Sequence, residues 1–194
     1  MAGAPLFSAN NCALIVIDVQ DYFLAKLPLD WRKPLVERIA WLMQVAHILE
    51  IPVIATAEDM ASDGPLVPEL EKQLRAGAGG VHDKKVFGLC DQSDILEAVR
   101  QTGRSECVVV GLETDVCIAH SALGLIDQGF RVAAIEDATA SPPPHHEAGL
   151  RRMAAGGVVL TNTKGIYYEW VRDLATHARV KSRINLPLPE GLTL

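Results

Sequence analysis

Short runs of apolar residues alternate along the chain with longer segments in which apolar residues recur every three or four positions. The short runs have the length of β-strands, and the longer segments have the period of amphipathic helices. We predict strands over residues 13–17, 52–56, 80–86, 107–111, 131–136 and 157–161. We predict helices over residues 34–50, 67–75, 93–102, 115–128, 144–155 and 166–177.

This alternation of strand and helix is typical of an α/β fold. The predicted strands are nearly continuous apolar runs, as expected when both faces of a sheet are buried. We therefore expect a three-layer, doubly wound, mostly parallel six-stranded sheet with helices on both faces. No internal repeat and no linker divides the 194 residues, which predicts a single domain over residues 1–194, and residues 179–194 are predicted to form an extended C-terminal tail.

The composition and charge of the chain argue against several classes of protein. A content of 49% hydrophobic and 22% charged residues indicates a compact protein with a large core, not a disordered chain. The net charge of -6 gives no basic footprint for nucleic acid or for an anionic membrane, and no apolar run is long enough to cross a bilayer. The four cysteines, which have neither CxxC nor zinc-ligand spacing, are expected to be reduced thiols in the cytoplasm: Cys12, Cys90, Cys107 and Cys117.

Several polar and reactive side chains stand at the carboxyl ends of the predicted strands, where open α/β sheets bind their ligands. They are Asp18 after the first strand, Glu58 and Asp59 after the second, Lys84 and Lys85 late in the third, and Cys117 after the fourth. Successive residues of a strand face opposite ways, so only one of the two lysines can point into a shared site. The sequence therefore predicts that a carboxylate, an ammonium group and a thiol meet at one end of the sheet.

Cys117 is expected in the first turn of a helix, with Thr114 or Asp115 as the N-cap. The positive end of the helix dipole and a nearby lysine would both favour the thiolate, which is the nucleophilic form. Asp18 would accept the thiol proton and later return it to a leaving group.

Three alternatives for Cys117 remain open from the residues alone. A buried cysteine is often only a small apolar side chain in a core. His120, one helical turn further on, lies on the same helix face and could form a Cys-His dyad. A redox thiol would need a resolving partner, for which Cys90 is the candidate.

Three motifs carry a family resemblance: IVIDVQDYF, KKVF and GLETDVC. Together they resemble the isochorismatase-like cysteine hydrolases, which include nicotinamidases and N-carbamoylsarcosine amidases, over roughly residues 11–175. The resemblance implies an Asp-Lys-Cys catalytic triad carried here by Asp18, Lys84 and Cys117. It also selects Lys84 over Lys85, because the family's lysine stands three residues before an aromatic residue, here Phe87.

The resemblance further implies a cis peptide bond between Leu112 and Glu113 and an oxyanion hole formed by the N–H groups of Glu113 and Cys117. The implied reaction is hydrolysis of a small amide through a thioester on Cys117, with Asp18 as the proton carrier. Many relatives have a small residue at the position of Glu113, so this side chain is a departure from the family.

The segment after the second strand, TAEDMASDGPLVPEL, contains no histidine, whereas metal-binding nicotinamidases have several there. We therefore expect the metal-free branch of the family, without metal or cofactor. The cysteine favours cleavage of a C–N bond in an amide, carbamoyl or ureido compound over the isochorismatase-type cleavage of a vinyl ether. A binding or scaffolding member of the fold without catalytic activity is the remaining alternative.

Large apolar side chains near the predicted strand ends suit the walls of a small pocket. We expect the substrate-binding residues to be Phe23, Trp31, Glu58 and Phe87. The expected partners are a small amide-like substrate and further copies of the chain, in a homo-oligomer that the family resemblance implies to be a dimer or tetramer. Neither nucleic acid nor a membrane is expected as a partner.

Overall fold

The computed structural model describes residues 6–74 and 80–194. Its centre is a six-stranded sheet with the order β3-β2-β1-β4-β5-β6, and every strand pairing in it is parallel. The strands are β1 (Cys12–Ile17), β2 (Val53–Glu58), β3 (Val81–Lys84), β4 (Glu106–Leu112), β5 (Arg131–Ala140) and β6 (Val159–Thr161). The predicted doubly wound α/β sheet is therefore confirmed, and it is wholly parallel.

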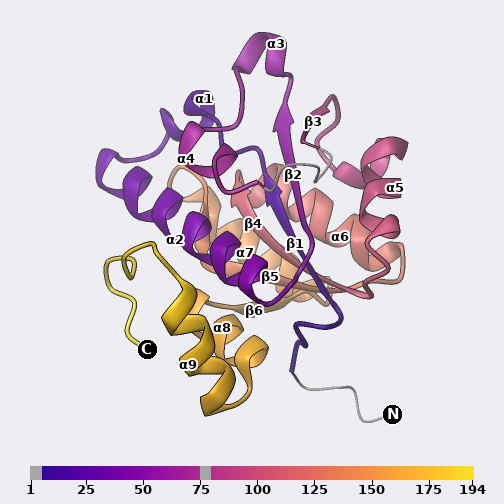
Figure 1. Cartoon of the computed structure of the whole chain (residues 1–194). Coiled ribbons are helices and arrows are strands. Elements are labelled where there is room, and N and C mark those ends of the chain that lie inside the picture. Colours follow the sequence, from indigo (N-terminus) through magenta and orange to yellow (C-terminus); the bar gives the residue numbers. More distant parts are fainter. Residues whose placement is uncertain (1–5, 75–79) are drawn as a thin grey trace.

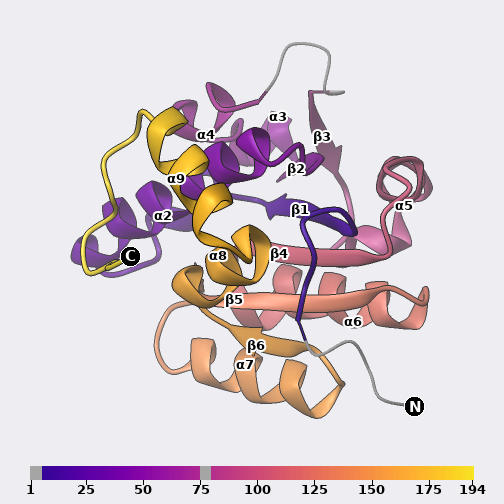
Figure 2. The same ribbon diagram turned by 60° about the horizontal axis from the view of Figure 1, so that its bottom comes forward.

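Helices cover both faces of this sheet (Figures 1 and 2). One face packs against α2 (Leu29–Ile48), α4 (Pro68–Glu71), α8 (Thr163–Val171) and α9 (Leu174–Arg183). The other packs against α5 (Ser93–Gln101), α6 (Ala119–Asp127) and α7 (His145–Ala155). Short helices α1 (Asp21–Leu24) and α3 (Met60–Asp63) lie near the carboxyl ends of the strands, and the 3-10 turn Leu89–Asp91 packs against α5 and α6. No helix in the described part of the chain has the length and apolar character needed to cross a bilayer.

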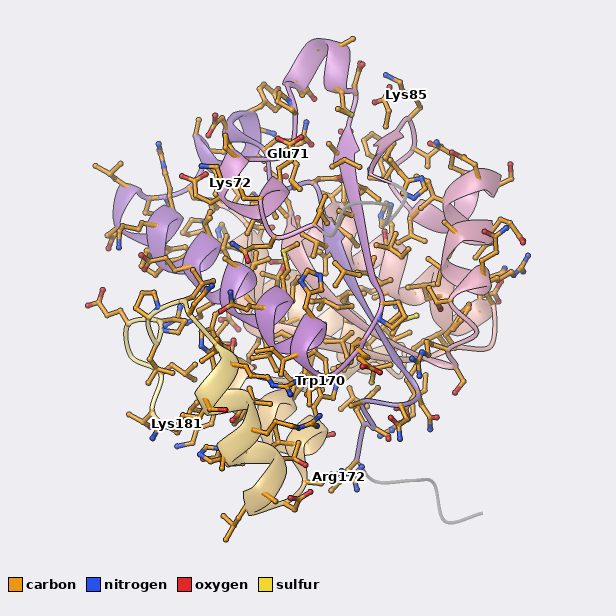
Figure 3. The ribbon with its side chains drawn as sticks, viewed as in Figure 1. Glu71, Lys72, Lys85, Trp170, Arg172 and Lys181 are labelled. Atoms are coloured by element: carbon orange, nitrogen blue, oxygen red, sulfur yellow. The ribbon has the colours of Figure 1, made fainter. Side chains whose placement is uncertain are left out.

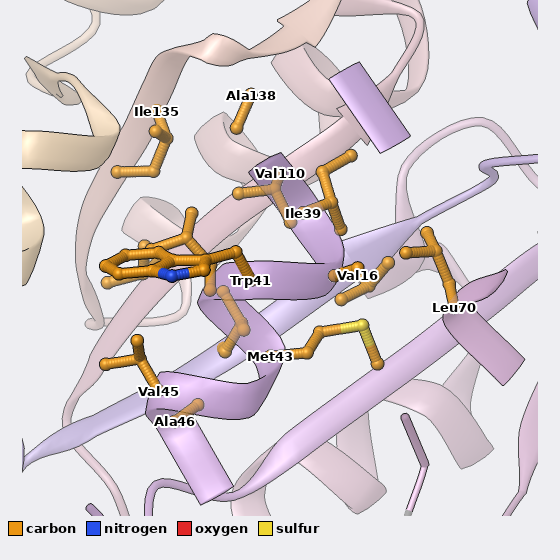
Figure 4. Packing of buried hydrophobic residues seen from close by; sticks show 14 of the residues in the cluster. Val16, Ile39, Trp41, Met43, Val45, Ala46, Leu70, Val110, Ile135 and Ala138 are labelled. Carbon is orange, nitrogen blue, oxygen red and sulfur yellow. The ribbon is translucent and has the colours of Figure 1, made fainter. Parts of the chain in front are cut away.

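The larger core lies between α2 and the sheet (Figure 4). Trp41 and Met43 of α2 are almost fully buried, and they face apolar side chains of the central strands such as Val16 and Val110. Burial of one such large side chain contributes about 1.5 to 3 kcal/mol, so this layer fixes α2 and the central strands as one rigid body. The rigid centre of the sheet is what positions the strand ends.

Strands β1 and β4 approach unusually closely just before their carboxyl ends. Gly111 has a φ of +123°, and a Cβ on it would lie 2.0 Å from the carbonyl oxygen of Ile17. Only glycine combines this backbone conformation with that contact. The residues that follow the two strands are therefore brought together at this point.

Two helix predictions are wrong in detail. Residues 115–128 were expected to form one helix capped by Thr114 or Asp115, but Thr114–Ile118 forms a π-helical turn and α6 begins at Ala119. Neither side chain caps the helix, because Thr114 hydrogen-bonds to Thr139 and the Asp115 carboxylate accepts a hydrogen bond from Ser141.

The C-terminal part also differs from expectation. The helix predicted over 166–177 is two helices, divided at Arg172, which has a φ of +61°. Asp173 caps the second helix by accepting a hydrogen bond from the Thr176 N–H at 2.8 Å. Since α9 continues to Arg183, the extended tail begins at Ile184 and not at residue 179.

Other boundaries differ by a few residues. Helix α2 begins at Leu29 instead of residue 34, β5 is longer than predicted, and β3 and β6 are shorter. The predicted helix over 67–75 is reduced to α4, and its last residue, Arg75, lies outside the described residues.

Candidate active site

The strand order reverses between β1 and β4, and this is the position at which doubly wound sheets bind ligands. Asp18 directly follows β1, and Cys117 lies in the turn that follows β4. The Asp18 backbone has a φ of +52°, in the left-handed region that few residues other than glycine adopt. This turn ends the strand and leaves the Asp18 side chain fully buried.

Asp18 and Lys84 form an ion pair without solvent exposure. The Lys84 Nζ lies 3.0 Å from the Asp18 Oδ2, and both side chains are 0% exposed. The other carboxylate oxygen, Oδ1, accepts a hydrogen bond from Thr56 at 2.7 Å. Lys84 also donates to the backbone oxygen of Val86. Buried charges are stable only when paired in this way, so the two residues depend on one another.

Cys117 lies against this pair, but its nearest polar contact is a different carboxylate. Its Sγ lies 3.1 Å from the Glu58 Oε2 and 3.8 Å from the Lys84 Nζ. Glu58 in turn accepts a hydrogen bond from Lys84 at 2.9 Å, and its side chain is 17% exposed. The structure thus brings together Asp18, Glu58, Lys84 and Cys117 from the ends of four adjacent strands.

Burial dominates the titration of these groups. It raises the pKa of the Cys117 thiol, the charge of Asp18 adds to this, and Lys84 opposes it. Burial also raises the pKa of Asp18 in spite of Lys84 and Thr56. Burial opposes the charge on Lys84, but Asp18 and Cys117 outweigh it and raise the Lys84 pKa. Lys84 favours the thiolate, as expected, but burial and the charge of Asp18 outweigh it, so the thiol needs a base.

Gln20 holds Glu58 in place through its backbone. The Gln20 side chain is fully buried, and its Oε1 accepts a hydrogen bond from the Glu58 N–H at 2.7 Å. Its Nε2 donates to the Glu58 carbonyl oxygen at 2.8 Å and to the Gly64 carbonyl oxygen at 2.7 Å. The end of β2 is therefore fixed by one amide side chain from the loop after β1.

The peptide bond between Leu112 and Glu113 is cis, at the position that the family resemblance predicts. The Glu113 carboxylate forms an ion pair with Lys26 at 3.3 Å. Lys26 also lies over the rings of Tyr22 and Phe23, at 4.6 and 4.4 Å from their centres. The side chain that departs from the family thus anchors the segment around α1 beside the site.

Helix α7 and the end of β5 support the turn that carries Cys117. Thr114 Oγ1 is 3.0 Å from the Thr139 Oγ1 and 2.8 Å from the His146 Nδ1. A Cβ on Gly149 of α7 would lie 2.7 Å from the Asp115 backbone. The turn is therefore packed directly against the helix backbone.

The other predicted substrate residues have different surroundings. Phe23 is buried in the core, and Phe87 is 58% exposed and packs edge-on against His120. Trp31 lines a neighbouring cavity of about 350 Å³ together with Thr139 and His146. Of the four, only Glu58 forms a described hydrogen bond with Cys117.

The alternative partners of Cys117 lie elsewhere. The described hydrogen bonds of Cys117 go to Glu58 and Lys84, and His120 faces Phe87 instead. Cys90 packs on α6 next to Gly124, well along the helix from Cys117. Lys85 points to the rim beyond β3, where it pairs with Asp59 and Asp83 (Figure 3).

Asp18, Glu58 and Cys117 bring two oxygens and a sulfur within 4.8 Å of one another, which is close enough to surround a metal ion. However, the Lys84 ammonium lies within 3.0 Å of both carboxylates. A metal ion there would be placed against this positive charge. The donor set therefore suits the lysine, which already supplies the cation.

Sequence reasoning missed the structural roles of Thr56 and Gln20 and assigned Glu58 to substrate binding. All three lie at or next to a strand end, which is the only signal that marks them. Their contacts depend on side-chain directions that the sequence pattern leaves undetermined.

Comparison with known proteins agrees with this fold. An isochorismatase domain matches residues 12–164. The zebrafish isochorismatase domain-containing protein 2 is 31% identical over 185 residues, which cover 93% of this chain and 89% of that protein. YcaC from Pseudomonas aeruginosa, solved with hexane-2,5-diol and covalent acrylamide, has a TM-score of 0.81 and 27% identity, and the match covers 93% of each chain.

A second solved relative is YcaC from Escherichia coli, described as an octameric hydrolase of unknown specificity. It has a TM-score of 0.82 and 27% identity, over 94% of this chain and 92% of the relative. The domain match and the zebrafish relative each span most of the sequence. The chain therefore belongs to the isochorismatase domain family.

Proposed function

We propose that this isochorismatase-family hydrolase cleaves the C–N bond of a small amide, carbamoyl or ureido compound through a thioester on Cys117. The contact of the Cys117 Sγ with Glu58 and Lys84, beside the buried Asp18–Lys84 pair, carries the proposal. A thiol with a raised pKa becomes a nucleophile when a neighbouring base takes its proton as the substrate is attacked.

In this mechanism the thiol sulfur attacks the amide carbonyl carbon, and the oxyanion is stabilised by the N–H groups of Glu113 and Cys117. Such donors contribute about 3 to 4 kcal/mol to transition-state stabilisation. Asp18 takes the proton of the thiol as the sulfur attacks and gives it to the nitrogen, which leaves as ammonia or an amine. Water, activated by the same carboxylate, then hydrolyses the thioester, and the sulfur regains a proton. Lys84 holds Asp18 and the thiolate in their charged forms, and Trp31, Phe23 and Phe87 are proposed to border the substrate.

The covalent acrylamide in the Pseudomonas aeruginosa relative supports this chemistry. Acrylamide is an electrophile, so its covalent attachment requires a nucleophilic group in that protein. It is also a small primary amide, which is the size of substrate that we propose.

The test is ammonia release from acetamide, benzamide, nicotinamide and N-carbamoylglycine by the wild-type protein and by Cys117→Ala. We expect Cys117→Ala to lower turnover by at least about a thousand-fold, because the nucleophile is removed. Cys107→Ala, which removes another buried thiol, is the matched control and should keep its activity. Equal turnover by Cys117→Ala and the wild type would exclude Cys117 as the nucleophile.

We also propose that the protein forms a homo-oligomer. The octameric state of the Escherichia coli relative supports assembly from identical chains. The dimer or tetramer expected from the sequence remains a prediction.

A further inference from the structure

Glu58 is the carboxylate of the site that is accessible to a substrate. Its side chain is 17% exposed, whereas Asp18 and Lys84 are 0% exposed. The Glu58 Oε2 lies 3.1 Å from the Cys117 Sγ. A carbonyl carbon must come within about 3.5 Å of the sulfur before it is attacked. The scissile amide of a bound substrate therefore lies beside the Glu58 carboxylate.

The two oxygens of Glu58 have different surroundings. Oε2 accepts a hydrogen bond from Lys84 at 2.9 Å and contacts the Cys117 thiol. Oε1 takes part in none of the hydrogen bonds described for this side chain. An ionised carboxylate accepts hydrogen bonds and donates none, so Oε1 can bind an N–H or ammonium group but not a second carboxylate.

The site holds one more negative than positive charge when both carboxylates are ionised. Lys84 contacts Glu58 at 2.9 Å and Asp18 at 3.0 Å, so a single ammonium group serves two carboxylates. Gln20 fixes the backbone of Glu58 by binding its N–H group at 2.7 Å and its carbonyl oxygen at 2.8 Å. The excess negative charge therefore has a fixed position, next to the sulfur and facing the opening of the site.

Two further lysines near the ends of the strands already have acidic partners. Lys26 pairs with Glu113 at 3.3 Å. Lys85 pairs with Asp59 at 2.7 Å and with Asp83 at 3.0 Å. A substrate carboxylate would have to compete with these side chains for a lysine, so neither lysine offsets the charge of Glu58.

We infer that Glu58 determines specificity by excluding substrates with a carboxylate close to the scissile bond and by favouring neutral or cationic primary amides. This inference rests on the proposed amide hydrolysis, with Asp18 as the proton carrier, and narrows its substrate class. Like charges repel each other across a few ångströms of a partly buried site. N-carbamoylglycine, a ureido acid, is therefore expected to be a poorer substrate than acetamide, benzamide or nicotinamide.

Alkylation of Cys117 by iodoacetamide and by iodoacetate tests the inference, because the two reagents have nearly the same shape and differ in charge. Mass spectrometry measures both rates, and their ratio cancels the fraction of thiolate, which is common to both. Relative to the ratio for free cysteine, we expect the wild type to prefer iodoacetamide by about ten-fold. Glu58→Gln keeps the size of the side chain and should reduce this preference to about two-fold or less. Added salt should weaken the preference of the wild type.

Ammonia release tests the same preference in turnover. Isocaproamide and succinamate have similar shapes, but only succinamate carries a carboxylate. We expect kcat/KM of the wild type to be about ten-fold higher for isocaproamide, after which Glu58→Gln should remove most of this difference.

Asp59→Asn is the matched control, since it changes the net charge by the same amount in the next residue, which pairs with Lys85. It should leave the alkylation ratio unchanged. The inference would be overturned by a wild-type ratio equal to that of free cysteine, by an unchanged ratio in Glu58→Gln, or by equal changes in both variants. Failure of the proposed function is distinct: the wild type would then release no ammonia that depends on Cys117, while the alkylation ratio would still decide the role of Glu58.

Discussion

Lys84 carries its positive charge in full burial, and the surrounding residues explain how. Asp18, Glu58, Cys117 and the Val86 carbonyl oxygen all contact its ammonium group. Each of these contacts favours the charged form of the lysine. In the described part of the chain, the side chains that stabilise the buried charge of Asp18 are this ammonium group and the Thr56 hydroxyl.

Lys84→Met should therefore destabilise the fold through Asp18. Removing one partner of a buried pair typically costs about 3 to 5 kcal/mol. Burial raises the pKa of Asp18 in the folded protein above its value in the unfolded chain. The folded protein therefore loses stability as the pH rises from the ordinary carboxyl range towards that raised pKa. Without Lys84 this loss of stability is larger.

Urea unfolding at pH 5 and pH 8 measures this effect. The difference in unfolding free energy between wild type and Lys84→Met should be larger at pH 8, where more of Asp18 is ionised. Adding Asp18→Asn to Lys84→Met should recover part of the stability. A difference that is the same at both pH values would contradict the assignment to Asp18.

The sequence predicts which residues are reactive better than it predicts the contacts that these residues make. Asp18, Lys84 and Cys117 were predicted to meet because each follows or ends a parallel strand, and the structure places them together. The contact between Glu58 and Cys117 depends on the register of β2 against β3, in which Glu58 lies beside Lys84. Such registers are set by packing of the whole sheet, so they cannot be predicted from the local pattern of apolar and polar residues.

Among the elements, α7 has the most direct influence on the turn of Cys117. Its residue Gly149 faces the backbone of Thr114 and Asp115, and the absence of a side chain allows the close contact. Thr114 is also bound by His146 from the same helix. A change in the position of α7 would therefore move the nucleophile.

Gly149→Ala is expected to destabilise the protein by about 1 to 3 kcal/mol, the usual cost of overpacking. Alanine is favoured over glycine in helices by up to about 1 kcal/mol, but the new Cβ would lie 2.7 Å from backbone atoms that cannot rotate away. Urea unfolding and kcat should both show a loss. Arg151→Ala, at an exposed position of α7, is the control, and equal behaviour of the two variants would contradict the packing role.

The existence and type of the long elements could be predicted, whereas several ends could not. The helix after β4 was predicted to start too early because Thr114 and Asp115 look like N-caps, although their side chains bind Thr139 and Ser141 in the structure. The division between α8 and α9 was missed although Asp173 and Thr176 form a capping pair. Local signals compete with tertiary contacts at such positions, and the tertiary contacts decide.

At the scale of the whole molecule, the C-terminal segment closes one side of the structure. Residues 184–194 cross α2, and Gln44 Oε1 accepts hydrogen bonds from the N–H groups of Asn185 and Leu186 at 2.8 and 3.0 Å. Arg38 donates to the Glu190 carbonyl oxygen at 2.9 Å, and Leu192 is buried in the core. The segment is therefore part of the fold, which its irregular, proline-containing sequence did not indicate.

Leu192→Ala should lower the free energy of unfolding by about 2 kcal/mol, at the lower end of the range for removing a buried leucine. Leu194→Ala is the matched control, because Leu194 is 41% exposed. Urea unfolding of both variants checks the difference. If both lowered stability equally, the segment would not be anchored by Leu192.

The parallel sheet also determines when the site can exist. Asp18, Glu58, Lys84 and Cys117 come from four strands that are far apart in the sequence, and β1 pairs directly with both β2 and β4. Such long-range pairing is slow, because the entropy of closing long loops is lost before the contacts form. A newly made or partly unfolded chain therefore contains the thiol without its lysine and carboxylates. The proposed attack of Cys117 on an amide therefore becomes possible only after the sheet has formed.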